Sequence, residues 1–350
     1  MRVKVSPAHN LHGKIQTVEG LIEPERLGPT LMHEHVLCDL TPPSLASQAG
    51  PEVEITLENV WEICYHWNKH LGNSRLNRED IAVQELRRLR EAGGQSLVDL
   101  SCVGTKRNPL GLRRVGKEAR VNIVMGCGHY TEEFLSPEIA KKSADMLAQE
   151  MISDILKGVD GTDIRSGIIG EIGCSYPWTE TEKRGMHAAV TAQQETGATI
   201  SVHPGRNPEA PHEIVQFITD AGGDPTRTIM GHIDRTIFGC DALLRLADTG
   251  CVVEYDFFGI ESSYYPFQEI DLPNDAMRLN MIRTLVDEGH LSRILISHDI
   301  CTRTRLVGYG GHGYGHIFAN IIPMMKRKGF TDQEIDTILV QNPCRLLTFV

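Results

Sequence analysis

The stretch Gly28-Pro-Thr-Leu-Met-His33-Glu34-His35-Val-Leu37 is a short apolar run that carries two histidines, two positions apart. Successive side chains of a β-strand alternate between its two faces, so His33 and His35 lie on the same face. Two imidazoles at the end of a buried strand can bind one metal ion together. The pair alone is a weak signal, and its weight depends on the rest of the sequence.

Four more potential metal ligands each end another apolar run farther along the chain. They are Glu171, at the end of Ser166–Glu171; His203, at the end of Ala198–His203; His232, at the end of Thr228–His232; and Asp299, at the end of Arg293–Asp299. Taken singly, a histidine at a strand end is more often a hydrogen-bonded structural residue, and an aspartate more often caps a helix. All six residues at comparable positions in their runs favour a metal site.

Eight such apolar runs recur along the chain, separated by segments of helical spacing. The predicted strands end near His35, Asp99, Cys127, Glu171, His203, His232, Asp256 and Asp299. The predicted helices include residues 77–92, 136–158, 179–197, 275–289 and 331–341. Continuous β-branched runs suit parallel strands that are buried on both faces. The pattern predicts an α/β fold, a (β/α)₈ TIM barrel that spans residues 1–350 as one domain.

Two segments extend this barrel. Residues 1–27 precede the first strand, and we expect a short hairpin there that flanks or plugs the barrel floor. The loop from Asp39 to Arg78 is unusually long, and we expect it to lie over the active face with a helix around residues 57–70. A doubly wound sheet would also alternate strands and helices, but it would not bring ligands from five strands to one point.

In a barrel, the carboxyl ends of the strands form a ring around one mouth. We expect His33, His35 and Asp299 to bind one metal ion, and His203 and His232 to bind a second, with Glu171 bridging the two. Imidazole and carboxylate ligands suit Zn²⁺, with Mn²⁺ or Co²⁺ as alternatives. Two such ions can share a hydroxide and polarise the bond that is cleaved.

Three neighbouring side chains have predicted roles of their own. Asp299 can act as general base in addition to binding metal. Strand alternation points Glu34 and His298 away from the cluster, where they could support the ligands by hydrogen bonds.

The composition of the chain argues against several classes of binding partner. The formal net charge of −11 argues against non-specific nucleic-acid binding and against attraction to anionic membranes. No segment approaches the ~20 apolar residues of a membrane span, and the start of the chain lacks an apolar secretory core. Nine cysteines without a CxxC pair indicate reduced thiols. We expect a cytoplasmic protein that acts on a small molecule, and a homodimer is compatible with the sequence.

Long, specific segments resemble the phosphotriesterase family of the amidohydrolase superfamily over nearly the whole chain, and most of all its phosphotriesterase-related branch. They are residues 30–35, 167–175, 202–206, 232–236, 254–259 and 298–314. The resemblance implies the same barrel, a binuclear metal site and hydrolysis. Phosphotriesterase itself bridges its metals with a carboxylated lysine on the fourth strand, whereas this chain has Glu171 there, as the related branch does. Efficient organophosphate hydrolysis belongs to the lysine-bearing members.

The residues predicted to contact the substrate lie in loops after the strands. Arg303 and Arg305 follow Asp299 and could bind a carboxylate, sulfonate or phosphate, although for either one alone a surface ion pair is about as common. Related lactonases place a tyrosine and an arginine at comparable loops, which implies substrate contacts for Tyr130 and Arg235. Arg206, three residues after His203, also lies near the predicted mouth.

The leading hypothesis is a metal-dependent hydrolase of an amide or ester bond in a small, anionic molecule. Relatives in the resembling branch are associated with N-acetylated taurine, so an N-acyl amide is the first expectation. A lactonase is the main alternative. Phosphotriester hydrolysis as a side activity is a third interpretation, and a non-catalytic ligand-binding barrel is a fourth.

Overall fold

Eight parallel strands form the sheet that the apolar runs predict. The computed structural model describes residues 11–46 and 52–350; residues 1–10 of the predicted N-terminal extension and residues 47–51 of the long loop lie outside the described residues. The strands are β3 (Thr30–Glu34), β6 (Ser96–Asp99), β7 (Asn122–Cys127), β8 (Ile168–Gly173), β9 (Ile200–His203), β10 (Thr228–Met230), β11 (Val252–Tyr255) and β12 (Ile294–Ile296).

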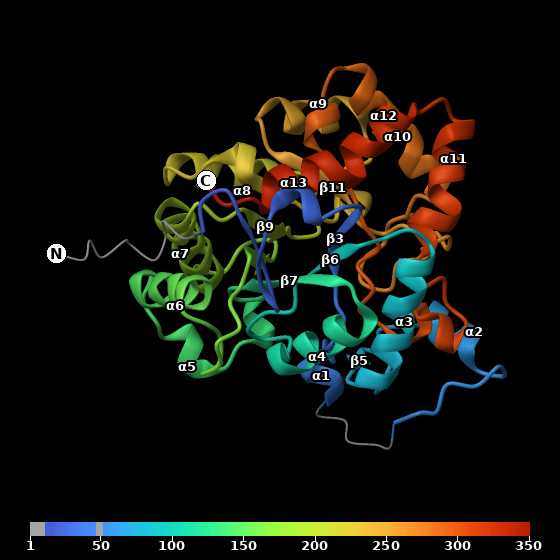
Figure 1. Ribbon diagram of the computed structural model, residues 1–350, viewed down its shortest axis with the longest axis horizontal. Helices are drawn as coiled ribbons and strands as arrows, with labels where there is room; N and C mark the ends of the chain where they lie inside the picture. The colour runs from blue at the N-terminus through green and yellow to red at the C-terminus, as the bar shows by residue number, and fades with distance from the viewer. Residues whose placement is uncertain (1–10, 47–51) are drawn as a thin grey trace.

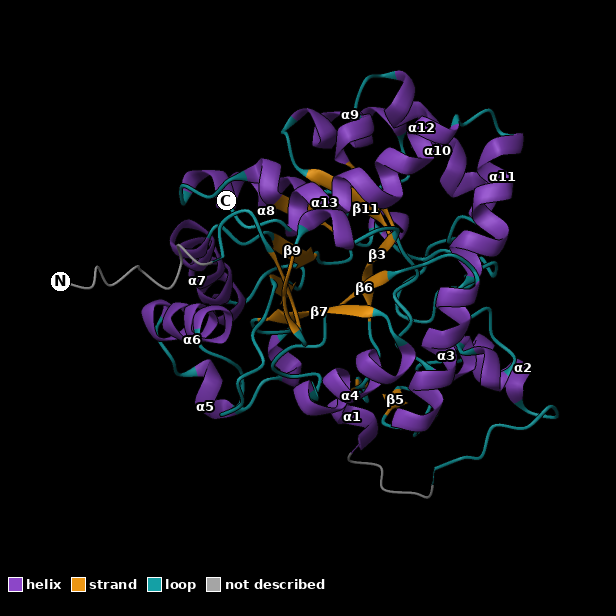
Figure 2. Ribbon diagram, viewed as in Figure 1, coloured by secondary structure: helices purple, strands orange, loops and turns teal. Residues whose placement is uncertain are grey.

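Each of these strands pairs with the next one along the chain, from β3 through to β12. The sheet curls until its first and last strands meet, where the backbone N–H of Asp299 donates to the carbonyl of His33 at 3.0 Å. Helices surround the strands on the outside (Figure 2). The predicted TIM barrel is confirmed.

Helices follow the strands around the outside of the barrel (Figure 1). One helix lies after each strand of the barrel, namely α3 (Glu79–Glu91), α4 (Pro109–Ala119), α6 (Ala144–Leu156), α7 (Glu180–Thr196), α8 (Ala210–Asp220), α9 (Cys240–Asp248), α10 (Asp275–Asp287) and α11 (Ile322–Arg327). Shorter helices are α1 (Pro43–Ala46), α2 (Val60–Tyr65), α5 (Pro137–Ala140), α12 (Asp332–Asp336) and α13 (Asn342–Leu347). No helix of the described residues is long and apolar enough to cross a membrane.

Three helix predictions differ from the structure. The single helix predicted over residues 136–158 is wrong, because Ser143 begins a new helix, α6, by accepting a hydrogen bond from the Met146 N–H. The helix expected over 57–70 is limited to α2. The helix predicted to end at residue 341 instead continues through a π-helical turn into α13.

The long loop after β3 also contains a short antiparallel pair, β4 (Cys38–Asp39) with β5 (Arg75–Leu76). A second pair, β1 (Ile15–Thr17) with β2 (Gly20–Ile22), is the expected N-terminal hairpin. The N–H of Val18 donates to the carbonyl of Ile123 in β7, at 2.9 Å.

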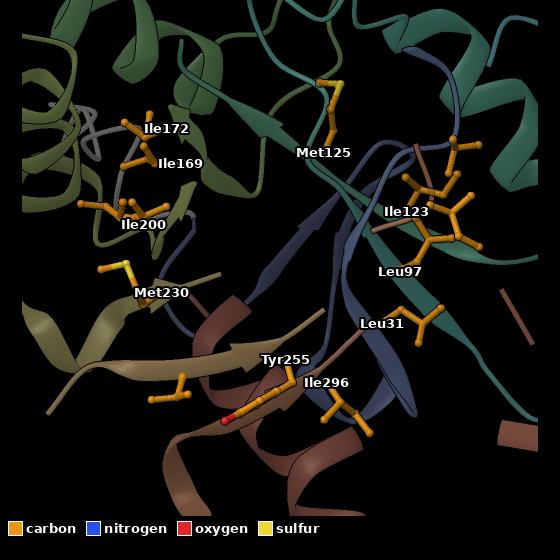
Figure 3. Close-up of a cluster of buried hydrophobic side chains, with 14 of the residues drawn as sticks. Leu31, Leu97, Ile123, Met125, Ile169, Ile172, Ile200, Met230, Tyr255 and Ile296 are labelled. Atoms are coloured by element: carbon orange, nitrogen blue, oxygen red, sulfur yellow. The ribbon is translucent and has the colours of Figure 1, made fainter. Parts of the chain in front are cut away.

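The apolar core has two layers. The larger one packs the outward side chains of the strands against the helices; Figure 3 shows part of it, including Leu31, Ile123, Ile200 and Ile296. A smaller layer fills the barrel interior with inward side chains of the strands, and Ile15 of the hairpin and Leu346 of α13 join it. The floor is therefore closed by apolar side chains, which leaves the opposite, carboxyl ends of the strands for polar residues.

Candidate active site

The six predicted ligands meet at the carboxyl ends of the strands, with Glu171 of β8 in the middle. Its Oε1 lies 2.8 Å from Nδ1 of His203, 2.8 Å from Nε2 of His232 and 3.3 Å from Nε2 of His33. The side chain of Glu171 is only 2% exposed. One carboxylate oxygen thus faces three imidazoles that come from three different strand ends.

The other oxygen of Glu171 faces a second group. His35 Nε2 lies 3.9 Å from Glu171 Oε2 and 3.3 Å from Asp299 Oδ1. His33 Nε2 lies 3.8 Å from the same oxygen of Asp299. Among the described residues, three sets of ligand atoms are compact enough to hold one ion each: His33 with Glu171 and His232, His33 with His35 and Asp299, and His33 with Glu254 and Asp256. All three share His33, and His203 joins the cluster through its contact with Glu171 Oε1 at 2.8 Å.

The sequence predicted that two of these strands end at their ligands, His232 and Asp299, but the observed strands end earlier. β10 ends at Met230 and β12 at Ile296, two and three residues before His232 and Asp299. Both residues have a φ of 53°, in the left-handed region that most residues avoid. The backbone thus turns sharply at each of these two ligands instead of continuing the strand.

The donor set fits divalent metal ions. His203 Nδ1 and His232 Nε2 are 2.8 Å apart, and both lie 2.8 Å from the same carboxylate oxygen. Lone pairs this close repel one another unless a proton or a cation lies among them. His33 Nε2 is buried and has no hydrogen-bond partner among the described residues. Nitrogen and carboxylate oxygen donors suit Zn²⁺, Mn²⁺ or Co²⁺.

The charges of the cluster also suit cation binding. Burial opposes ionisation of Glu171, but His203 and His33 hold the pKa of its carboxyl well below the usual range. Burial lowers the pKa of His203 well below its usual value, which favours a neutral imidazole with a free lone pair. The Glu171 carboxylate therefore keeps its negative charge beside the neutral imidazole of His203.

Asp256 and Glu254 complete the cluster, and no functional role was predicted for them. Asp256 Oδ1 lies 2.9 Å from His232 Nδ1, and its Oδ2 accepts the His232 backbone N–H at 2.8 Å and lies 3.1 Å from His33 Nδ1. Such a contact orients the ring and leaves Nε2 for a metal. Burial raises the pKa of Glu254 to about 7. The signal that could have identified them is their spacing of two residues at the carboxyl end of β11.

Glu34 and His298 lie on the far side of the ligands, as strand alternation predicts. Glu34 Oε1 lies 2.7 Å from His298 Nδ1 and accepts the Ser297 hydroxyl at 2.9 Å. Its Oε2 accepts the Ile300 N–H at 3.0 Å. This buried carboxylate holds the chain on both sides of Asp299, and so fixes where that ligand lies.

A cavity of about 940 Å³ opens above the cluster. His203, His232 and Asp299 reach it from below. The other polar residues at its wall include Lys69, Tyr130, Glu133, Arg206 and Arg235, and the apolar ones include Leu40, Trp67, Phe134, Phe257, Tyr265 and Phe267. Tyr130 and Arg235 thus lie where substrate contacts were predicted for them.

The structure does not place Arg303 or Arg305 in this cavity. Arg303 donates to the Arg75 carbonyl at 2.8 Å and to Glu52 at 3.1 Å, within the long loop after β3. Arg305 donates to the carbonyls of Asp299, at 2.6 Å, and of His298. Both guanidinium groups therefore hold loop segments together by hydrogen bonds. The cationic groups that do reach the cavity are on other loops.

Comparison with known proteins places the chain among relatives of the same length. The family model of the phosphotriesterase family matches residues 13–347. An N-acetyltaurine hydrolase of Dictyostelium discoideum is 43% identical and covers 97% of this chain and 98% of its own. The N-acetyltaurine hydrolase of Homo sapiens is 42% identical over 97% and 99% of the two chains.

A solved structure agrees in fold. The resiniferatoxin-binding protein from Rhodobacter sphaeroides is 34% identical, with a TM-score of 0.91 over 98% of both chains. These matches confirm the family that the sequence resembles. They also confirm the prediction that the protein is a hydrolase. This chain belongs to the phosphotriesterase family.

Proposed function

We propose that this protein hydrolyses the amide bond of a small, anionic N-acyl amide, with N-acetyltaurine as the first candidate. The observation that carries the proposal is the Glu171 carboxylate, set between two groups of imidazoles at the base of a cavity whose wall bears arginines. The choice of substrate rests on relatives that are more than 40% identical over nearly the full length. These relatives are named N-acetyltaurine hydrolases.

Two divalent cations are the cofactors we propose, Zn²⁺ first and Mn²⁺ or Co²⁺ as alternatives. His33, His35 and Asp299 would hold one ion and His203 and His232 the other, with Glu171 between them. Bound there, the ions would activate water and polarise the carbonyl that is attacked. Since Glu171 is a carboxylate by itself, the site needs no modified side chain to complete it.

Asp299 is the proposed general base. Its side chain is 12% exposed, against 0–8% for the other five ligands, so it is the ligand most open to the cavity. Its Oδ1 lies 3.3 Å from His35 Nε2. A carboxylate at this position can take the proton of the attacking water and then pass it to the leaving amine.

The proposal is tested by offering the metal-loaded protein four substrates side by side: N-acetyltaurine, a simple aryl ester, a γ-lactone and a phosphotriester. We expect release of acetate and taurine in equal amounts, at the highest kcat/KM of the four. A higher kcat/KM for the lactone would assign the protein as a lactonase. No turnover of any of the four with both metals bound would favour the non-catalytic ligand-binding barrel.

Two further expectations belong to this proposal. All nine cysteines are free, which suits the reducing cytoplasm that we propose as the location. A homodimer stays a prediction from the sequence, and sedimentation of the purified protein would decide it.

A further inference from the structure

The loops after β9 and β10 repeat one pattern. His203-Pro-Gly-Arg206 follows one strand and His232-Ile-Asp-Arg235 follows the next, so each strand presents a cluster histidine and then, three residues later, an arginine. The two strands are hydrogen-bonded neighbours in the sheet. Both arginines line the cavity. The repeat therefore brings two positive charges to the same side of the cluster.

Arg206 is supported by two aromatic residues, while its terminal nitrogens remain free to bind a ligand. Its Nε–H donates to the hydroxyl of Tyr265 at 2.8 Å, and its guanidinium carbon lies 4.8 Å from the ring centroid of Phe267. Its two terminal nitrogens make no hydrogen bond with the described residues, and none of the ion pairs among those residues includes Arg206. The aromatic support orients a guanidinium fork whose outer donors are free.

Arg235 is more deeply buried and forms no ion pair with the described residues. It is 2% exposed, and its Nη2 donates to the Pro204 carbonyl at 3.1 Å and lies 3.1 Å from His203 Nε2. Its Nη1 is buried without any partner among the described residues. A buried cationic donor without a partner is costly unless a ligand fills the place.

We infer that Arg206 and Arg235 form a binding site for the acidic group of the substrate, and that this group is a sulfonate. The inference rests on the proposed function and names the part of the substrate that selects it. Three free donor nitrogens, two on Arg206 and one on Arg235, match the three oxygens of a tetrahedral sulfonate better than the two of a carboxylate. An anion bound here leaves the amide on the cluster side of the cavity.

The test compares three N-acetyl amides of similar length: N-acetyltaurine, N-acetyl-β-alanine and uncharged N-propylacetamide. In Arg206→Gln we expect KM for N-acetyltaurine to rise about 10- to 100-fold, the range for losing hydrogen bonds to a charged group, with kcat changed much less. KM for N-propylacetamide should change by less than about threefold. Equal losses on the charged and uncharged amides would overturn the site.

Two variants and one control sharpen the comparison. Arg206→Lys keeps the charge but not the fork, so it should recover part of the loss for the carboxylate and less for the sulfonate. Tyr265→Phe should raise KM for the sulfonate without changing metal content. The control is Arg26→Gln, an exposed arginine at the opposite end of the barrel that loses the same charge. An Arg26→Gln effect equal to that of Arg206→Gln would show a general charge effect and overturn the site.

Binding of propane-1-sulfonate, measured by calorimetry on the metal-loaded protein, separates this inference from the proposed function. Binding that is lost in Arg206→Gln supports the anion site even if N-acetyltaurine is not hydrolysed, in which case only the proposed function fails. Hydrolysis of N-acetyltaurine with sulfonate binding unchanged in Arg206→Gln would leave the function and remove the site.

Discussion

At the scale of single residues, the site contains buried carboxylates whose negative charges are offset by neighbouring imidazoles. Glu171 lies among imidazoles, and Asp256 lies behind two of them, at 2.9 Å from His232 Nδ1 and 3.1 Å from His33 Nδ1. Each carboxylate is buried and each faces nitrogen atoms that offset its charge. Because the carboxylates of the cluster attract cations, we expect the removal of one charge to weaken metal binding more than it destabilises the fold.

Glu171→Gln removes the negative charge between the two ion positions. We expect elemental analysis of the saturated wild type to approach two metal ions per chain and that of the variant to fall toward one, with activity lost. A wild-type value near one after saturation would contradict the bridging position of Glu171.

Asp299→Asn keeps the shape of the ligand but removes the proton acceptor. We expect kcat to fall by roughly 10²- to 10⁴-fold, the usual contribution of a general base. The measurement is kcat for N-acetyltaurine together with metal content. Near-normal turnover with both metals present would exclude Asp299 as the base.

His129 predicts a pH effect on stability. Burial lowers the pKa of His129 to about 4, and neither ring nitrogen has a partner among the described residues. Because the folded-state pKa lies below the unfolded value of about 6.5, the unfolded state binds the proton more tightly, and stability is lost as pH falls from about 6.5 toward 4. His129→Gln should remove a penalty of about 2 kcal/mol at pH 5.

The measurement for His129 is urea unfolding of wild type and variant at pH 5 and pH 7.5. The exposed His187→Gln is the control, and its difference from wild type should be the same at both pH values. A His129→Gln difference that does not change with pH would show that His129 takes up its proton over the same pH range in the folded and the unfolded protein.

At the scale of elements, the loops over the barrel mouth are held by side chains from distant segments. Glu85 of α3 is fully buried and accepts the backbone N–H groups of Val307, at 2.9 Å, and Gly308, at 3.0 Å. Arg303 ties the same loop region to the long loop after β3. The loop that follows Asp299 is thus shaped by α3 and by the first loop as much as by its own sequence.

Glu85→Ala leaves two backbone donors of that loop without their acceptor. We expect the free energy of unfolding to fall by about 2–4 kcal/mol, since hydrogen bonds to a buried charged group contribute about 1.5–3 kcal/mol each and water replaces part of them. Chemical denaturation measures the change. Gln84→Ala, an exposed neighbour on the same helix, should change stability by less than about 0.5 kcal/mol. Equal effects of the two would mean that Glu85 does not hold the loop.

At the scale of the whole molecule, the proposed metal ligands connect distant parts of the barrel. They come from β3 and the residue after it, from β8 and β9, and from the turns after β10 and β12, which lie far apart in the sequence. Ions that bind only the folded arrangement stabilise it by mass action. The same ions would also hold together the first and last strands of the sheet.

Chelation should therefore lower Tm, and adding back Zn²⁺ or Mn²⁺ should restore both Tm and activity. Since Glu171 is itself a carboxylate, restoration should not depend on bicarbonate. Reactivation that requires bicarbonate would assign the bridging position to a modified lysine, and an unchanged Tm on chelation would indicate that the ions do not link the strands.

The barrel and the positions of the six proposed ligands could be predicted from local sequence patterns. Strand periodicity is a local property, and parallel strands of a closed sheet bring all their carboxyl ends to one mouth. Residues such as His33, His203 and Glu171 could therefore be predicted without knowing any contact between them. The N-terminal hairpin and most helices follow from local patterns in the same way.

Which arginines line the cavity could not be predicted from local sequence patterns. Arg303 and Arg305 are near Asp299 in sequence, but they bind loop backbone, whereas Arg206 and Arg235 reach the cavity. The difference depends on segments as distant as Glu52, which binds Arg303 across 251 positions. The direction of a long side chain is set by whichever partners the fold brings to it, and sequence spacing does not contain those partners.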